Sequence, residues 1–125
     1  MPDTANVAKI KQRYHDEKII FAIGRLVSYK GFMYLVESAK YLDDDCVILI
    51  SGKGYEEGRL ESILNQYNLH DKVKLLGYLS EQEKYDYLEA CDIFCLPSIT
   101  KAEAFGVVII EAMPFSKPIT CMIQE

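Results

Sequence analysis

The sequence predicts an α/β protein built on a doubly wound parallel sheet. Short apolar runs, rich in β-branched and aromatic residues, end at glycine or proline, which is typical of strands. These runs do not alternate polar and apolar residues, so both faces of each strand are expected to be covered. Longer amphipathic segments of helical length separate them, and parallel strands require such crossovers.

The composition describes one globular domain. Of the 125 residues, 50 % are hydrophobic and 26 % are charged, as is usual for a folded domain of this length. No apolar run approaches the roughly 20 residues that span a bilayer, and the N-terminus has no signal-peptide pattern. We therefore expect a soluble, cytoplasmic protein. The net charge of −5 argues against nucleic-acid binding, which needs a broad basic surface.

The spacing of apolar residues places the individual elements. Strands are expected at residues 19–24, 46–51, 73–77, 92–97 and 118–123. Helices are expected at residues 31–42, 56–67 and 81–91. Residues 1–17 show no strand pattern, and they are expected to form a linker or a lead-in helix before a unit that spans residues 18–125.

The segment 104–113 carries two opposing signals. Four consecutive β-branched residues, 107–110, favour a strand by local propensity. The segment also lies between two expected parallel strands, which need a right-handed crossover. Topology therefore predicts a buried helix here, with Glu103 just before its first turn and Glu111 about two turns in.

Two cations follow the first expected strand, in the stretch GRLVSYKG at 24–31. Ligands of doubly wound sheets lie beyond the carboxyl ends of the strands, so Arg25 and Lys30 are expected beside an anion. Two cations at this place suit a pyrophosphate. The alternative is that both are solvated loop residues.

The second expected strand runs into SGKGYEEG at 51–58. This stretch does not fit the dinucleotide fingerprint, because the third glycine comes one residue late. Gly52 and Gly54 are expected to let the backbone turn tightly beside a ligand. Glu56 and Glu57 are ordinary acids for the first turn of a helix.

The loops after the third and fourth expected strands add further candidates. Ser80 and Glu83 have the spacing of a capping box for the next helix. Tyr78 and Leu79 lie at the strand end, where they are expected to flank a planar base. Ser98 ends the fourth strand at the same edge.

The two glutamates that bracket the β-branched run suggest a polyol ligand. A pyrophosphate would repel Glu103 and Glu111 unless each accepts hydrogen bonds from neutral groups such as vicinal hydroxyls. Sugars and riboses supply such hydroxyls. The backbone amides of Phe105, Gly106 and Val107, at the expected helix start, would approach a phosphate or a sugar. The alternative is one loop glutamate and one exposed helix glutamate.

No metal site is expected. The cysteines and histidines lack the paired spacing of zinc ligands, so the cysteines are read as buried reduced thiols. These residues are Cys46, Cys91, Cys95, Cys121, His15 and His70.

Together these motifs resemble a known enzyme family. The stretch GRLVSYKG, the GKG loop, GYLS and PSITKAEAFGVVIIEAMPFSKPI, with its E-x7-E spacing, are similar to the donor-binding C-terminal domain of GT-B glycosyltransferases of family 4, the glycosyl-group-1 type. The resemblance covers residues 18–123 and implies a Rossmann-like half of a GT-B fold. The sequence departs from it at residues 114–116, where the family commonly has a small residue and glycine.

The resemblance implies an activity and a set of site residues. It implies a retaining transferase that uses a nucleotide-diphosphate sugar and no cofactor or metal. Arg25 and Lys30 would hold the diphosphate, Glu111 the ribose hydroxyls, and Glu103 the donor sugar. Arg25, Lys30 and Glu103 form the catalytic set. The substrate-binding set is Gly24, Gly52, Gly54, Tyr78, Leu79, Ser98, Glu103, Ala104, Phe105, Gly106, Val107 and Glu111.

The resemblance also implies that much of the enzyme is absent. Such enzymes have two halves, so the acceptor-binding N-terminal half, a C-terminal strand and the closing helices are expected to be missing, and the fragment alone is expected to be inactive. The resemblance also allows peripheral membrane association through the missing half. An unpaired apolar edge at residues 118–123 predicts self-association or a frayed C-terminus.

Three other interpretations remain. A GT-B-type nucleotide-sugar epimerase would keep the donor site and transfer nothing. A non-catalytic nucleotide-sugar-binding module would look the same within this chain, and the sequence upstream would separate it from a transferase. A dinucleotide-dependent oxidoreductase is disfavoured by the glycine spacing.

Overall fold

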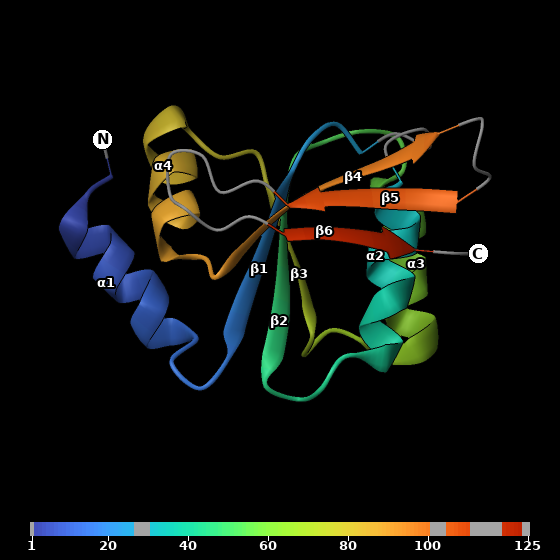
Figure 1. Ribbon diagram of the computed structural model, residues 1–125, viewed down its shortest axis with the longest axis horizontal. Helices are drawn as coiled ribbons and strands as arrows, with labels where there is room; N and C mark the ends of the chain where they lie inside the picture. Colours follow the sequence, from blue (N-terminus) through green and yellow to red (C-terminus); the bar gives the residue numbers. More distant parts are fainter. Residues whose placement is uncertain (1, 27–30, 101–104, 111–118, 124–125) are drawn as a thin grey trace.

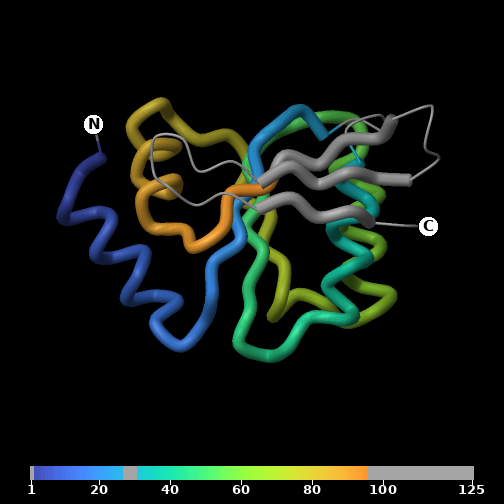
Figure 2. Tube along the Cα trace, viewed as in Figure 1, coloured from blue at the N-terminus to red at the C-terminus, as the bar shows by residue number. Residues whose placement is uncertain are grey.

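The computed structural model describes residues 2–26, 31–100, 105–110 and 119–123, with side chains through residue 95 (Figures 1 and 2). Four parallel strands form the centre of the molecule: β1 (Lys18–Ile23), β2 (Cys46–Ser51), β3 (Val73–Gly77) and β4 (Ile93–Thr100). Their order in the sheet is β3-β2-β1-β4. The predicted α/β class with a doubly wound parallel sheet is confirmed.

Helices cover both faces of this sheet. One face carries α1 (Thr4–Arg13) and α4 (Glu81–Ala90), and the other carries α2 (Phe32–Ser38) and α3 (Glu57–Tyr67) (Figure 1). A 3-10 turn at Ala39–Tyr41 follows α2. Within the described residues, no helix combines the length and the apolar character that crossing a bilayer requires.

The strands are apolar throughout because alternate side chains enter two separate cores. Phe21 and Leu49 pack in the cluster under α1 and α4, whereas Ala22, Ile48 and Ile50 pack in the cluster under α2 and α3. All five side chains are buried. Because both faces of the strands are buried, the sequence lacks the alternation of polar and apolar residues that is typical of a sheet with one solvent-exposed face.

A capping box starts α4, as its sequence predicts. The Ser80 hydroxyl accepts from the Glu83 amide at 3.1 Å, and the Glu83 carboxylate accepts from the Ser80 amide at 3.1 Å. Both bonds satisfy amides that the helix itself leaves unpaired. The first turn of α4 is therefore fixed directly after the end of β3.

The helix predicted for residues 104–113 is wrong. Residues Phe105–Ile110 form strand β5, which pairs antiparallel with β4, and Ile119–Ile123 form β6, antiparallel to β5. Antiparallel neighbours need only a short connection, so the crossover that favoured a helix is not required. The β-branched residues at 107–110 therefore form the strand that their local propensity favours.

The predicted strand at 118–123 exists, and it occupies the end of the sheet. The full order is β3-β2-β1-β4-β5-β6, so β6 pairs with one neighbour within the described residues. Self-association through this edge stays a prediction.

Helix α1 is joined to α4 by a buried carboxylate that the sequence did not reveal. Asp86 of α4 is 1 % exposed. It accepts hydrogen bonds from the Asp3 amide at 2.6 Å, the Asn6 side chain at 2.7 Å and the Gln82 side chain at 3.0 Å. Asp3 in turn caps the N-terminus of α1. Residues 4–13 thus form a helix that shares the core of the sheet, with Val7 and Ile10 buried.

These hydrogen bonds set the ionisation of Asp86. Burial alone would raise its pKa, but the bonds from Asp3, Asn6 and Gln82 favour the charged form and leave the pKa below its ordinary value. A lowered native pKa stabilises the fold above the unfolded pKa, which is about 4. That stabilisation is lost as the pH falls through the lower native pKa.

We expect Asp86→Asn to lower the free energy of unfolding by about 1–3 kcal/mol at pH 7, because an amide brings a donor into a site of donors. The difference from the wild type should shrink as the pH drops below about 4. Urea denaturation across pH measures both. Asp71→Asn, at an exposed position, is the control, and an equal effect from both variants would contradict the role of Asp86.

Candidate functional site

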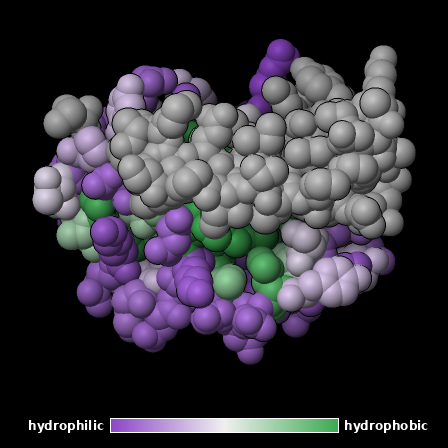
Figure 3. Space-filling view, in the orientation of Figure 1, coloured by the Kyte–Doolittle hydropathy of each residue, from purple (hydrophilic) through white to green (hydrophobic). Residues whose placement is uncertain are grey.

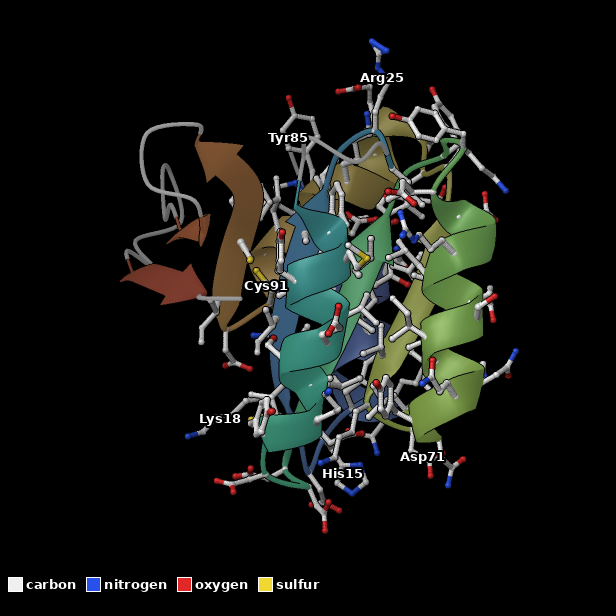
Figure 4. All side chains as sticks on the ribbon, turned by 90° about the vertical axis from the view of Figure 1, so that its right-hand side faces the viewer. His15, Lys18, Arg25, Asp71, Tyr85 and Cys91 are labelled. Carbon is white, nitrogen blue, oxygen red and sulfur yellow. The ribbon has the colours of Figure 1, made fainter. Side chains whose placement is uncertain are left out.

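The candidate site lies at the carboxyl edge of the parallel strands. The loops after β1, β2 and β3 all leave the sheet at this edge, because the three strands are parallel. Figure 4 shows Arg25 at this end of the molecule, and His15, Lys18 and Asp71 at the other. Tyr85 of α4 lies toward the Arg25 end in the same view. The topology therefore brings the loop residues of three separate segments together.

Backbone hydrogen bonds tie the first two of these loops to each other. The Gly24 amide donates to the Ser51 carbonyl at 3.1 Å, and the Leu26 amide donates to the Lys53 carbonyl at 3.0 Å. The Glu56 amide returns a bond of 2.9 Å to the Leu26 carbonyl. The loop after β1 thus extends the sheet pairing beyond the end of the strand.

The loop after β2 is tied to β3 in the same way. The Gly52 amide donates to the Gly77 carbonyl at 2.8 Å, and the Ser51 hydroxyl donates to the same carbonyl at 3.1 Å. The register between β2 and β3 shifts at this point, so that Ser51 pairs with Gly77. Three loops consequently form one connected edge.

Two glycines make this close contact sterically feasible. A Cβ atom on Gly52 would lie 1.8 Å from the Gly24 carbonyl oxygen, and a Cβ atom on Gly54 would lie 2.4 Å from the Leu26 carbonyl oxygen. Gly52 also has a φ of 144°, which other residues rarely adopt. Both glycines therefore make a close approach to the loop after β1, and the expected ligand beside them stays a prediction.

The side chains of this edge divide into exposed and buried ones. Arg25 is exposed, and Tyr78 is 77 % exposed directly after β3. Leu79, in contrast, is buried in the core under α1 and α4, so its side chain does not flank a base at the edge. The physical reason is that burying a leucine side chain in the core has a lower free energy than exposing it to water.

The sequence reasoning missed Lys53 as a candidate. Its side chain is 63 % exposed, and its Nζ lies 3.5 Å from the Glu57 carboxylate, which is 39 % exposed. The Lys53 Nζ also lies 3.7 Å from the position that a Cβ atom on Gly77 would take. The sequence signal for Lys53 as a site residue is its position between Gly52 and Gly54, directly after an expected strand.

Several predicted site residues lie outside the described residues: Lys30, Glu103, Ala104 and Glu111. Others are described by their backbone alone. Ser98 of β4 pairs with Val107 of β5, and Gly106 and Phe105 pair with the next two residues of β4. These three β5 residues belong to a strand, so the expectation that their amides open a helix is wrong. Their approach to a phosphate or a sugar stays a prediction. Strand pairing directs amides sideways, toward neighbouring strands.

The opposite end of the sheet offers a different surface. A cavity of about 800 Å³ lies there, and the described surface at the bottom of Figure 3 is largely hydrophilic. Its charged lining residues are three cations and three acids: Arg13, Lys72, Lys74, Glu17, Asp44 and Asp71. Lys72 and Lys74 already donate to backbone carbonyls, at 2.6 and 2.8 Å. Balanced and paired charges give this cavity no net attraction for a phosphate.

In the described part of the chain, no three or more histidine, cysteine or acidic side chains gather as metal ligands would. Cys91 and Cys95 are buried reduced thiols, as expected, and Cys46 is half-buried. Burial, followed by the neighbouring Asp45, raises the pKa of the Cys46 thiol, which therefore stays protonated near neutral pH.

Comparison with known proteins relates the whole chain to one family. Residues 3–122 match the family model described as glycosyl transferases group 1. An alpha-D-kanosaminyltransferase from Streptomyces kanamyceticus is 30 % identical over 120 residues, which cover 92 % of this chain and 31 % of that protein. The chain thus spans about a third of the length of this relative.

Solved structures share the fold. A mutant of S. aureus TarM, solved with Fondaparinux, alpha-GlcNAc-glycerol and UDP, aligns with a TM-score of 0.57 and 28 % identity over 63 % of this chain and 16 % of that chain. Anabaena HepE in complex with UDP and glucose aligns with a TM-score of 0.68 and 18 % identity, over 77 % of this chain and 27 % of that one.

The contact between the two loops predicts a matched pair of variants. Gly52→Ala should lower the free energy of unfolding by about 2–3 kcal/mol or more, because it adds a clash with Gly24 and strains the backbone. Gly58→Ala in α3, where a Cβ atom meets nothing within 4 Å, should raise it by about 0.5–1 kcal/mol. Chemical denaturation of both variants is the measurement. Equal stability of the two would show that the loops do not touch as described.

Proposed function

Since the chain belongs to the glycosyl transferases group 1 family, we propose that its carboxyl edge binds the nucleotide-diphosphate sugar donor of a retaining glycosyltransferase. The observation that carries the proposal is the connected edge itself, which presents the Arg25 loop, the Lys53 loop and Tyr78 side by side. Doubly wound sheets bind ligands at such an edge. The names of the relatives and the UDP in two similar structures support the same chemistry.

Arg25 is the described residue best suited to the diphosphate. Its guanidinium is exposed, and within the described residues no carboxylate lies within 4.0 Å of it. A planar guanidinium donates two parallel hydrogen bonds to phosphate oxygens. Lys30, from the same loop, is proposed as the second cation.

The proposed reaction depends on stabilising the leaving group. In a retaining transfer the acceptor hydroxyl attacks the sugar carbon on the face that the diphosphate leaves, and the departing diphosphate takes the proton of that hydroxyl. No protein nucleophile and no metal are then needed. Negative charge grows on the diphosphate, and Arg25 with Lys30 would stabilise it in the transition state.

The remaining predicted residues complete the proposal. Glu111 is assigned to the ribose hydroxyls and Glu103 to the donor sugar, because carboxylates accept hydrogen bonds from paired hydroxyls. The acceptor is proposed to bind to a further half of a longer protein, since this chain spans about a third of the kanosaminyltransferase. A nucleotide-sugar-binding module without activity, or an epimerase, would share the donor site but not the transfer.

We expect Arg25→Ala to weaken nucleoside diphosphate binding by about 10–100-fold, because one charge-assisted bond contributes about 1.5–3 kcal/mol. The unfolding free energy should stay within about 0.5 kcal/mol of the wild type, since Arg25 is exposed. Isothermal titration calorimetry and thermal melts provide the two readouts. Lys9→Ala, on the exposed surface of α1, is the charge-matched control, and unchanged affinity in Arg25→Ala would remove Arg25 from the site.

A second expectation separates binding from transfer. The 125-residue chain should bind a nucleoside diphosphate with a Kd of about 10⁻⁴ M and transfer no sugar, because transfer needs the donor and acceptor aligned in one closed site. Calorimetric titration measures the first, and an assay for released diphosphate with candidate acceptors measures the second. Sugar transfer by this chain alone would refute the need for a further half, and absent binding would refute the donor site.

A further inference from the structure

Lys53 lies at a position in the candidate site where a diphosphate bound to Arg25 would not need it. It is held by its backbone to Leu26 of the β1 loop, at 3.0 Å, but its side chain extends the other way, toward Gly77 at the end of β3. Neighbouring strands lie about 4.8 Å apart, so its ammonium, near the end of β3, lies about two strands, or roughly 10 Å, from β1, the strand that the Arg25 loop follows. A nucleotide whose diphosphate meets Arg25 would reach Gly77 with its base.

The partner of Lys53 also argues against a phosphate ligand. Glu57 lies 3.5 Å from the Lys53 Nζ, so the pair carries no net charge. The carboxylate would repel a phosphate beside the pair and so offset part of its attraction to the ammonium. The Lys53 side chain is exposed and that of Glu57 is partly exposed, and such surface pairs stabilise folds little. A neutral ligand with polar edges fits this place better.

The pair presents a donor group beside an acceptor group. The Lys53 ammonium only donates hydrogen bonds, and the Glu57 carboxylate only accepts them. Uracil and guanine each carry a carbonyl oxygen next to a ring N–H, which is the complementary arrangement. We propose that Lys53 and Glu57 read this edge and so make the site selective for uridine or guanosine diphosphate donors. This inference rests on the proposed donor site.

Adenine carries the opposite arrangement. Its exocyclic amino group donates, and the adjacent ring nitrogen accepts, so the ammonium would face another donor in the orientation that suits uracil and guanine. Tyr78, which is 77 % exposed directly after Gly77, offers a ring for stacking any base. Tyr78 therefore supplies affinity without selection, and the selection comes from Lys53 and Glu57.

The test is calorimetric titration of the full chain with UDP, GDP and ADP. The wild type should bind UDP or GDP more tightly than ADP. Lys53→Met should weaken UDP and GDP binding by about 10-fold, and ADP binding by less than about 3-fold. Lys9→Met removes the same charge from the exposed surface of α1 and should leave all three affinities unchanged. Equal thermal melts establish that each variant is folded.

An equal loss for all three nucleotides in Lys53→Met would place Lys53 at the diphosphate and overturn base selection. Unchanged affinities in Lys53→Met would overturn any contact between Lys53 and the nucleotide. A wild type that binds none of the three would instead overturn the proposed donor site, and with it this inference.

Discussion

The architecture of the site depends on one backbone contact, between the loop after β1 and the loop after β2. Gly52 leaves room for the Gly24 carbonyl where any side chain would collide with it, and the bonds between Gly24 and Ser51 and between Leu26 and Lys53 follow from that approach. The bond from Gly52 to Gly77 adds the loop after β3. Without this contact, the exposed side chains would belong to three independent loops and would share no fixed geometry.

The contact explains how an acidic chain could hold the diphosphate site that we propose. The net charge is −5, yet Arg25 is held at the strand ends with no described carboxylate within 4.0 Å. Burial of the strands on both faces by helices makes the sheet a firm base for this edge. Local placement, and not overall charge, therefore decides which ligand the edge attracts.

The sequence predicted what depends on local patterning. The strands at 46–51 and 73–77 were predicted with the bounds that the structure shows, and the capping box at Ser80 was predicted with its partner. The run at 107–110 was misread because an assumed parallel crossover was given more weight than the propensity of β-branched residues. The burial of Asp86 and Leu79 and the contact of Gly52 with Gly24 could not be predicted from the sequence. Each depends on which distant residues meet in the fold.

The most direct test of a donor site on this edge is a map of amide chemical shifts during titration with UDP and GDP. We expect shifts at Arg25, at residues 52–54 and at Tyr78, with none in α1 or around the cavity at the opposite end of the sheet. Shifts confined to that opposite end, or no shifts at all in a folded sample, would contradict the proposed donor site.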